Sequence, residues 1–146
     1  MHRCVATMRM LFAAMLIVLS AACVTNASSS STTDTTEPTP ISYELHRGST
    51  TEVLVDMGIV SRSTIEYYDI NLCNTTDTTL LLLDYEATCR CVWLDLPREP
   101  LAPKDSTSIR LWFDSRGEWG TVGNYIGVST SLEDIAIAVW MSAEVE

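Results

Sequence analysis

Two cysteines separated by a single residue, Cys89-Arg90-Cys91, are the part of this sequence best suited to chemistry. In an extended strand, residues i and i+2 share a face with their Cα atoms about 6.5 to 7 Å apart, just beyond the usual reach of a disulfide. A turn or bulge at Arg90 would bring the sulfurs together, and a strained disulfide is easily reduced. We expect a structural pair, with thiol–disulfide redox exchange, metal capture and cross-linking to a partner as alternatives.

Other catalytic and metal-binding groups are scarce. Structural zinc usually takes two well-spaced pairs of cysteine or histidine, whereas one pair is visible here and His46 is the one histidine beyond the N-terminal segment. The sequence lacks the Gly-x-Ser-x-Gly motif of many hydrolases, and Gly117, Gly120 and Gly123 stand in a β-type loop rather than before a helix. We therefore expect no metal, no cofactor and no enzymatic activity, a redox role of the thiols being the main exception.

The elements that must position these residues are strands, because apolar and polar residues alternate in short runs separated by turn-forming segments. The expected strands cover residues 42–46, 52–57, 64–73, 79–87, 92–95, 106–113, 121–130 and 134–145. Seven or eight short strands within 106 residues predict an all-β fold, a single immunoglobulin-like antiparallel β-sandwich over residues 41–146.

The third and fourth expected strands are separated by residues 74–77, which have the composition of a hairpin turn. Such a hairpin would place Cys73 about 33 Å along the ladder from Cys89, which excludes a bridge between the two. We expect Cys73 to be a small side chain on a sheet surface, with an intermolecular disulfide as the alternative.

The four tryptophans, Trp93, Trp112, Trp119 and Trp140, could stack on sugar rings. Alternation points Trp112 and Trp140 away from the core, but their strands would belong to different sheets, so these two cannot form one platform. Trp119 lies in a glycine-flanked loop and is the candidate ligand contact of a glycan-binding module. Alternatively, most of the rings cap the edges of the sandwich or join its core.

The first 22 residues have the features of a secretory signal peptide. Arg3 and Arg9 precede an uncharged run of 13 residues, 10–22, which ends in small side chains. This run is shorter than the about 20 residues that a spanning helix needs. A membrane anchor that stays attached is the alternative.

The residues around Cys23, Leu19-Ser20-Ala21-Ala22-Cys23, resemble a bacterial lipobox. This resemblance implies that Cys23 receives lipid and becomes the N-terminus, whereas ordinary signal cleavage would leave it a bystander. Residues 23–40 are rich in Ser and Thr and are expected to be a disordered tether. Val24 is not an acidic retention signal, so the expected location is the outer membrane if the host is Gram-negative.

The charge balance limits the possible partners. The chain has 19 acidic and 9 basic residues and a net charge of -10, and residues 41–146 alone hold 17 acids against six arginines and one lysine. Nucleic-acid binding depends on basic residues that neutralise phosphates, so we expect no nucleic acid. The same charge is repelled by an anionic membrane, so contact with the membrane would be made through the lipid at Cys23.

Several short segments occur in a characteristic order: Met57-Gly58-Ile59-Val60, Ile70-x-Leu72-x-Asn74, Thr88-Cys89-Arg90-Cys91, Leu101-Ala102-Pro103, Gly120 and Tyr125-Ile126-x-Val128. Over about residues 50–146 this order resembles a bacterial domain-of-unknown-function family of secreted and lipid-anchored proteins, marked by a Ser-Cys-Gly-Cys-Thr motif. The resemblance implies an immunoglobulin-like fold similar to PapD-type chaperones and to the hydin and major-sperm-protein group, and no known reaction. Arg90 stands where that family has glycine, and Val92 stands where it has threonine.

These features together predict a lipid-anchored, exported, non-enzymatic interaction or accessory module of the cell envelope. Its partner would be a protein of unknown identity, and an open sheet edge could accept a strand from it, as in PapD-type chaperones. A Cys89–Cys91 redox module and a glycan-binding module are the alternative functions.

Overall fold

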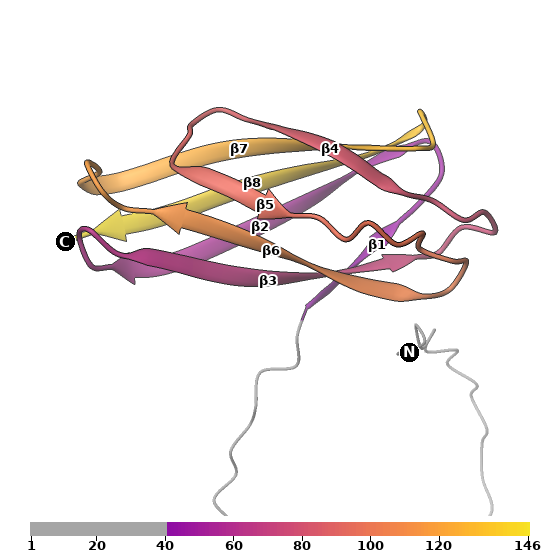
Figure 1. Cartoon of the computed structure of the whole chain (residues 1–146), viewed down its shortest axis with the longest axis horizontal. Helices are drawn as coiled ribbons and strands as arrows, with labels where there is room; N and C mark the ends of the chain where they lie inside the picture. Colours follow the sequence, from indigo (N-terminus) through magenta and orange to yellow (C-terminus); the bar gives the residue numbers. More distant parts are fainter. Residues whose placement is uncertain (1–40) are drawn as a thin grey trace, which may run out of the picture. The chain divides into compact units, whose positions relative to one another are not determined.

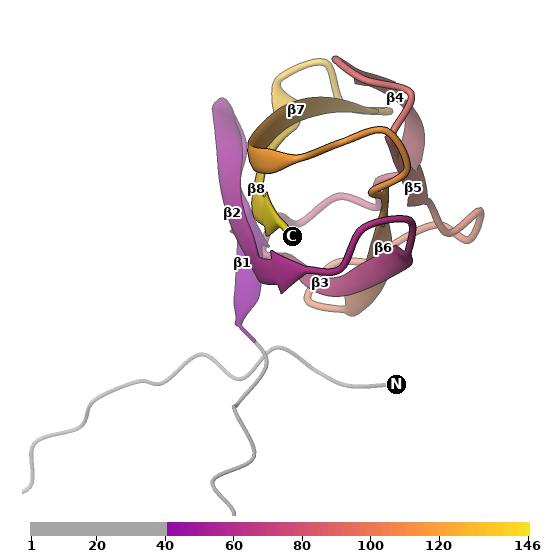
Figure 2. The ribbon, with the colours of Figure 1, turned by 90° about the vertical axis from the view of Figure 1, so that its left-hand side faces the viewer.

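The computed structural model describes residues 41–146, which form eight β-strands and, within that range, no helix (Figure 1). The strands are β1 (Ser42–Leu45), β2 (Ser49–Val60), β3 (Ile65–Asn74), β4 (Leu82–Ala87), β5 (Val92–Asp95), β6 (Ser106–Asp114), β7 (Gly120–Thr130) and β8 (Ile135–Val145). They form two four-stranded sheets that pack face to face, as the view along the strands shows (Figure 2). The expected all-β sandwich is confirmed.

The signal peptide, lipidated Cys23 and tether expected from the sequence lie outside the described residues. Residues 41–146 contain no helix with the length and apolar character needed to cross a membrane.

The core lies between the two sheets and is built by alternation along each strand. In β6, Ile109, Leu111 and Phe113 are completely buried, whereas Arg110 and Trp112 between them lie on the outer face and are half-buried. Each such buried apolar side chain contributes about 1.5 to 3 kcal/mol relative to an exposed one. Alternation within one strand therefore fixes both the core and the residues presented on the outer face.

The strand order is β1-β3-β6-β5 in one sheet and β2-β8-β7-β4 in the other. Most neighbours are antiparallel, but β1 pairs with β3, and β2 with β8, in the parallel direction, so both sheets are mixed. The expectation of a purely antiparallel sandwich is wrong at these two pairings. Neither pair is consecutive in the chain, so no hairpin imposes an antiparallel direction on it.

The expected hairpin between the third and fourth strands is also wrong, because β3 and β4 belong to different sheets. Asn74 ends β3, is fully buried, and fixes this crossing through its side chain. Its amide group donates to the carbonyl oxygens of Thr78 at 2.9 Å and Leu101 at 3.0 Å, and its carbonyl oxygen accepts the Thr76 hydroxyl at 2.7 Å. A buried polar side chain that satisfies several backbone groups replaces the hairpin here.

Cys73, just before this turn, lies in the middle of its sheet between Glu44 of β1 and Ser106 of β6. Cys73 alternates with the core residue Leu72 and so lies on the outer face, as expected, but it is only 3% exposed, so the expected exposure at a sheet surface is wrong. The separation from Cys89 calculated along a β3–β4 hairpin does not apply either, since that hairpin does not form.

Candidate functional site

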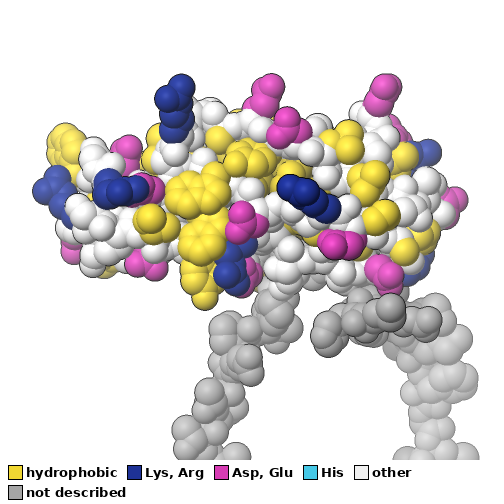
Figure 3. All heavy atoms as spheres, in the orientation of Figure 1, with side chains coloured by type: hydrophobic (Ala, Val, Ile, Leu, Met, Phe, Trp, Pro, Cys, Tyr) yellow, Lys and Arg dark blue, Asp and Glu magenta, His cyan; other side chains and the backbone are white. Residues whose placement is uncertain are grey.

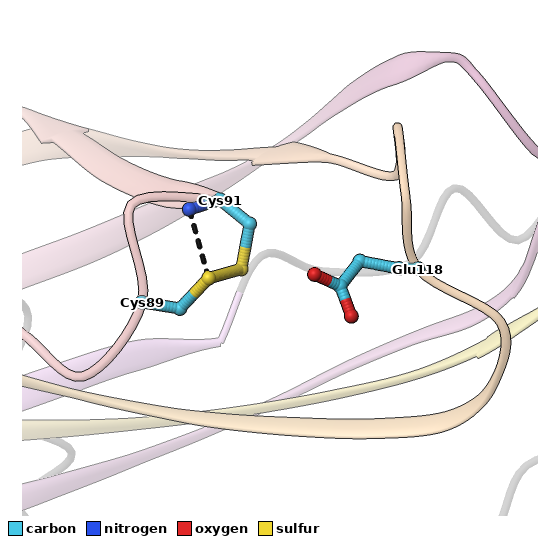
Figure 4. Close-up of side chains that lie close together, drawn as sticks. All are labelled: Cys89, Cys91 and Glu118. Atoms are coloured by element: carbon cyan, nitrogen blue, oxygen red, sulfur yellow. Dashed lines mark hydrogen bonds between the residues drawn. A yellow bond between two sulfur atoms is a disulfide. The ribbon is translucent and has the colours of Figure 1, made fainter.

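The segment that joins β4 to β5 crosses from one sheet to the other and carries the cysteine pair. Arg90 and Cys91 form a turn, which brings the Cα atoms of Cys89 and Cys91 to 5.1 Å from each other, closer than in an extended strand. The two sulfurs are joined in a disulfide (Figure 4). The bend at Arg90 is the local geometry that closure of this pair requires.

Hydrogen bonds hold this segment to both sheets. The Thr88 N–H donates to the Tyr125 carbonyl oxygen in β7 at 3.0 Å, and the Thr88 hydroxyl accepts the Tyr125 N–H at 3.1 Å. On the other side of the pair, the Cys91 carbonyl oxygen accepts the N–H of Asp114, the last residue of β6, at 2.8 Å. The disulfide therefore lies on a segment that is fixed at each end.

Each sulfur of the disulfide accepts a hydrogen bond. The Cys91 N–H donates to Sγ of Cys89 at 2.9 Å (Figure 4), and the side-chain amide of Asn124 in β7 donates to Sγ of Cys91 at 3.6 Å. After reduction, a donor aimed at sulfur favours the thiolate, which is the reactive form of cysteine. Both cysteines are half-buried, so the pair keeps some access to solvent.

Glu118 brings a carboxylate to the same place. A carboxylate oxygen of Glu118 and the sulfurs of Cys89 and Cys91 all lie within 4.8 Å of one another. Figure 4 shows the Glu118 carboxylate pointing toward the disulfide. A half-buried carboxylate at this distance can exchange a proton with a cysteine thiol through one bridging water. With reduced thiols, the three residues offer three ligand atoms of the kind that zinc accepts.

The sequence alone does not identify Glu118 and Asn124 as neighbours of the cysteines. Glu118 belongs to the loop between β6 and β7, where its N–H donates to the Ser115 carbonyl oxygen at 3.1 Å. The turn-forming residues around Gly117 predict that loop, but residue composition does not predict which distant segment a loop contacts. Trp119, the expected ligand contact, follows Glu118 and is 75% exposed.

A second candidate site is a row of aromatic side chains on the outer face of the first sheet, which we call the aromatic platform: Tyr67, Trp112 and Trp93. Trp112 of β6 pairs in register with Tyr67 of β3 on one side and with Trp93 of β5 on the other. Its ring centroid lies 5.3 Å from that of Tyr67, at an interplanar angle of 54°. The centroid of Trp93 is 6.0 Å away, and the two indole planes are within 10° of parallel. Three strands thus supply one aromatic surface.

A second row, the charged row, runs beside the platform and consists of Asp69, Arg110 and Asp95, again in register across β3, β6 and β5. The Arg110 guanidinium donates to both carboxylate oxygens of Asp69, at 2.7 and 2.9 Å, and its central carbon lies 4.0 Å from the ring centroid of Tyr67. The Trp112 indole N–H donates to Asp95 at 2.7 Å. These contacts fix two rings of the platform to its polar neighbours.

The hydrogen bonds from Arg110 lower the pKa of Asp69 below its ordinary value, and partial burial opposes this change. The same hydrogen bonds raise the pKa of Arg110. The pair is therefore ionised at neutral pH and keeps the charged row in place beside the platform.

The outer face of the second sheet has its own apolar row, which we call the opposite row: Leu54, Trp140 and Tyr125, in register across β2, β8 and β7. The Tyr125 and Trp140 centroids are 4.7 Å apart. Trp112 and Trp140 thus lie on different sheets, as expected, and do not share a platform. Beside this row is a groove of about 400 Å³ whose lining includes Tyr125, Gly127 and Ala136.

The described domain is a two-sheet β-sandwich with a disulfide in a crossing between the sheets and an aromatic platform on one outer face. The chain belongs to a family of proteins of unknown function, DUF1573, whose model matches residues 48–145. The resemblance noted in the sequence is confirmed at this level. No curated protein sequence matches the chain significantly.

The solved structures that this chain resembles share little sequence with it. A protein of unknown function from Porphyromonas gingivalis W83 superposes with a TM-score of 0.56 at 15% identity, covering 70% of this chain and 47% of that one. The chain therefore spans about half the length of that protein. The Vibrio cholerae VesB protease gives a TM-score of 0.44 at 10% identity, covering 70% of this chain and 31% of that one. Similarity at the first of these levels shows the fold alone, and the second carries no functional argument.

Proposed function

We propose that this protein is a lipid-anchored, exported, non-enzymatic interaction module of the cell envelope, with the aromatic platform as its interaction surface. The observation that carries the proposal is the in-register alignment of Tyr67, Trp112 and Trp93 on an outer sheet face. Tryptophan and tyrosine supply large contact areas at low cost in conformational entropy, and they dominate the binding energy of many interfaces.

The contacts of the charged row support this role because they fix the rings before any ligand arrives. Trp112 is held by its hydrogen bond to Asp95, and Tyr67 is covered by the guanidinium of Arg110. Side chains that are already ordered lose little rotamer freedom on binding, so more of the contact energy appears as affinity. A surface that serves packing alone does not need this preorganisation.

The proposed anchor is a lipid on Cys23, which would hold the acidic domain near a membrane that repels it. The membrane would be the outer membrane if the host is Gram-negative. The test is metabolic labelling with palmitate. We expect label in the wild-type chain and none in Cys23→Ala, and equal labelling of the two chains would contradict the anchor.

The interaction surface is tested by photo-crosslinking of the full chain in its envelope. A diazirine amino acid, which reacts with C–H bonds of proteins and glycans alike, replaces Tyr67, which is 53% exposed on the platform. The matched control replaces Leu54, which is 70% exposed in the opposite row. We expect a discrete adduct from position 67 and none from position 54. Absence of an adduct at position 67, or the same adducts from both positions, would contradict the proposal.

A second candidate function is thiol–disulfide exchange at Cys89 and Cys91, favoured by the donor that each sulfur already has. One thiolate of a dithiol partner would attack the Cys89–Cys91 disulfide and form a mixed disulfide with one of the two cysteines. The partner's second thiolate would then displace that cysteine, which leaves the partner oxidised to a disulfide, and the two protons of the partner's thiols would pass to Cys89 and Cys91. Glu118 is placed to carry one of these protons.

This exchange is tested by alkylation and mass spectrometry of the exported chain before and after mild reduction with a dithiol. We expect an oxidised pair that is reduced quickly, and about tenfold slower reduction in Glu118→Gln if the carboxylate carries a proton. Thr121→Ala is the matched control, since Thr121 lies in the neighbouring strand and hydrogen-bonds Glu144 instead. Free thiols in the exported chain, or a bridge that resists strong reductant, would rule out this function.

A further inference from the structure

We propose that the aromatic platform binds a neutral polysaccharide whose sugar rings stack on Trp93 and Trp112. This inference rests on the proposed function and adds the chemical class of the ligand. It also differs from the glycan contact expected at Trp119, because the stacking surface is assembled by three strands and not by one loop residue.

The arrangement of the rings is the first argument. The indole rings of Trp93 and Trp112 are stacked with an offset, with planes within 10° of parallel and centroids 6.0 Å apart, so part of each ring face is left free. Pyranose rings present flat faces of C–H groups, which pack on aromatic faces, and successive sugars of a linear chain repeat that face at a regular interval. Tyr67, tilted by 54° from Trp112, extends the surface at one side.

The polar groups beside the rings are the second argument. Ionised carboxylates are acceptors with about four lone-pair sites each, so Asp69 and Asp95 can accept sugar hydroxyls besides the donors that they already hold. Arg110 is a donor whose side chain is 39% exposed. A sugar ring on the platform therefore has both acceptors and a donor at its margin, which is the mixture that its hydroxyl groups require.

The shape and charge of this face select the ligand further. Figure 3 shows a hydrophobic patch on the surface beside basic and acidic side chains, rather than at the bottom of a cleft. Protein partners are usually anchored by side chains that fill pockets, whereas a glycan packs on exposed ring faces at the surface. Two carboxylates flank the single guanidinium of the charged row, and the chain has a net charge of -10, so an anionic polymer is repelled.

The test measures depletion of the full chain, purified in mild detergent, by insoluble chitin and cellulose, with soluble alginate as the anionic comparison. We expect saturable binding to at least one of the neutral polymers and none to alginate. Trp93→Ala should weaken binding by about tenfold or more, and Tyr67→Ala should weaken it less, by about threefold. Trp140→Ala and Trp119→Ala are the matched controls and should bind as the wild type does. A thermal melt of each variant confirms that it is folded.

Tyr67→Ala keeps the test decisive if Trp93→Ala does not fold, because Tyr67 is 53% exposed. Absence of binding to both neutral polymers would overturn the inference, and so would stronger binding to alginate. The inference would also fail if Trp119→Ala lost binding while Trp93→Ala and Tyr67→Ala bound as the wild type does. If the crosslink at position 67 nevertheless forms and its adduct is digested by protease, the ligand is a protein. The proposed interaction function is then supported, and the inferred polysaccharide ligand is wrong. If that crosslink is also absent, the proposed function fails with it.

Discussion

The two outer faces of this sandwich carry comparable apolar rows but differ in the row that lies beside them. The aromatic platform is bordered by the charged row, in which Asp95 accepts a hydrogen bond from Trp112 and Arg110 lies over the ring of Tyr67. Beside the opposite row, the next register places the small residues Ala138 and Gly127 next to Trp140 and Tyr125, with Glu52 and Glu86 only at its two ends. The first face therefore has two rings held by polar neighbours, and the second has a groove.

This difference shows that an exposed tryptophan alone does not define a binding surface. Trp112 contacts two rings and one carboxylate, whereas Trp140 contacts the ring of Tyr125. In the groove, a Cβ atom added at Gly127 would lie 3.2 Å from the Tyr125 hydroxyl, so the absence of a side chain there is what lets Tyr125 lie against the sheet. Trp112 is held by the carboxylate of Asp95, whereas the Tyr125 ring packs over Gly127.

The comparison is tested most strongly by removing the central ring of each face. Trp112→Ala should lower the free energy of unfolding by about 2 kcal/mol, because it loses two ring contacts and a hydrogen bond to a carboxylate. Trp140→Ala should lower it by about 1 kcal/mol, because it loses one ring contact. Urea denaturation measures both, and equal losses would show that the two faces are not organised differently.

A smaller effect is expected from two glycines in β7. At Gly127, an added Cβ atom would lie 3.2 Å from the Tyr125 hydroxyl oxygen, which is a tight contact. At Gly123, the nearest atom to an added Cβ would be the Met141 carbonyl oxygen at 3.9 Å, which is an ordinary contact. Alanine in a strand is favoured over glycine by about 0.5 to 1 kcal/mol, so Gly123→Ala should stabilise the domain. Gly127→Ala should be less stable than Gly123→Ala by about 1 kcal/mol, because the Tyr125 ring must move. Identical stabilities in urea would mean that Tyr125 does not depend on the small residue.

The smallest expected effect is the pH dependence contributed by the charged row. The pKa of Asp69 is lowered in the folded state, so its ion pair with Arg110 stabilises the fold above the unfolded pKa of about 3.9 and is lost as pH falls through the folded value. The Asp69 side chain is 45% exposed, so solvent screening limits this contribution to about 0.5 kcal/mol. The stability gap between wild type and Asp69→Asn should therefore be present at pH 7 and close below about pH 4. A gap that persists at pH 2 would contradict this assignment.

Much of the fold could be predicted because it depends on local alternation. The expected strand over residues 106–113 matches β6 (Ser106–Asp114) closely, and the turn needed at Arg90 is present. The expected hairpin after β3 failed because the buried side chain of Asn74 bonds to a distant loop, at Leu101, and turns the chain toward the other sheet. A turn composition reports that the chain bends, but it does not report where the next strand goes.

The candidate site divides in the same way. The spacing of Cys89 and Cys91 indicated that the pair could close, whereas the proximity of Glu118 and Asn124 depends on how two other segments, the β6–β7 loop and β7, fold around it. Signals for such contacts are absent from a single sequence because the residues are separated by many others and share no motif.

The sequence by itself determined that the domain is all-β, that Trp112 and Trp140 face away from the core on different sheets, and that one cysteine pair could bridge if the chain turned at Arg90. Only the tertiary structure decided that Trp93 and Tyr67 join Trp112, and that Glu118 joins the cysteines. The physical reason is that alternation has a period of two residues, so it fixes the face of each side chain. If one strand shifted by two residues against its neighbour, every side chain would keep its face of the sheet but would have a different cross-strand neighbour. The register between strands is therefore set by the packing of segments that are distant in the chain.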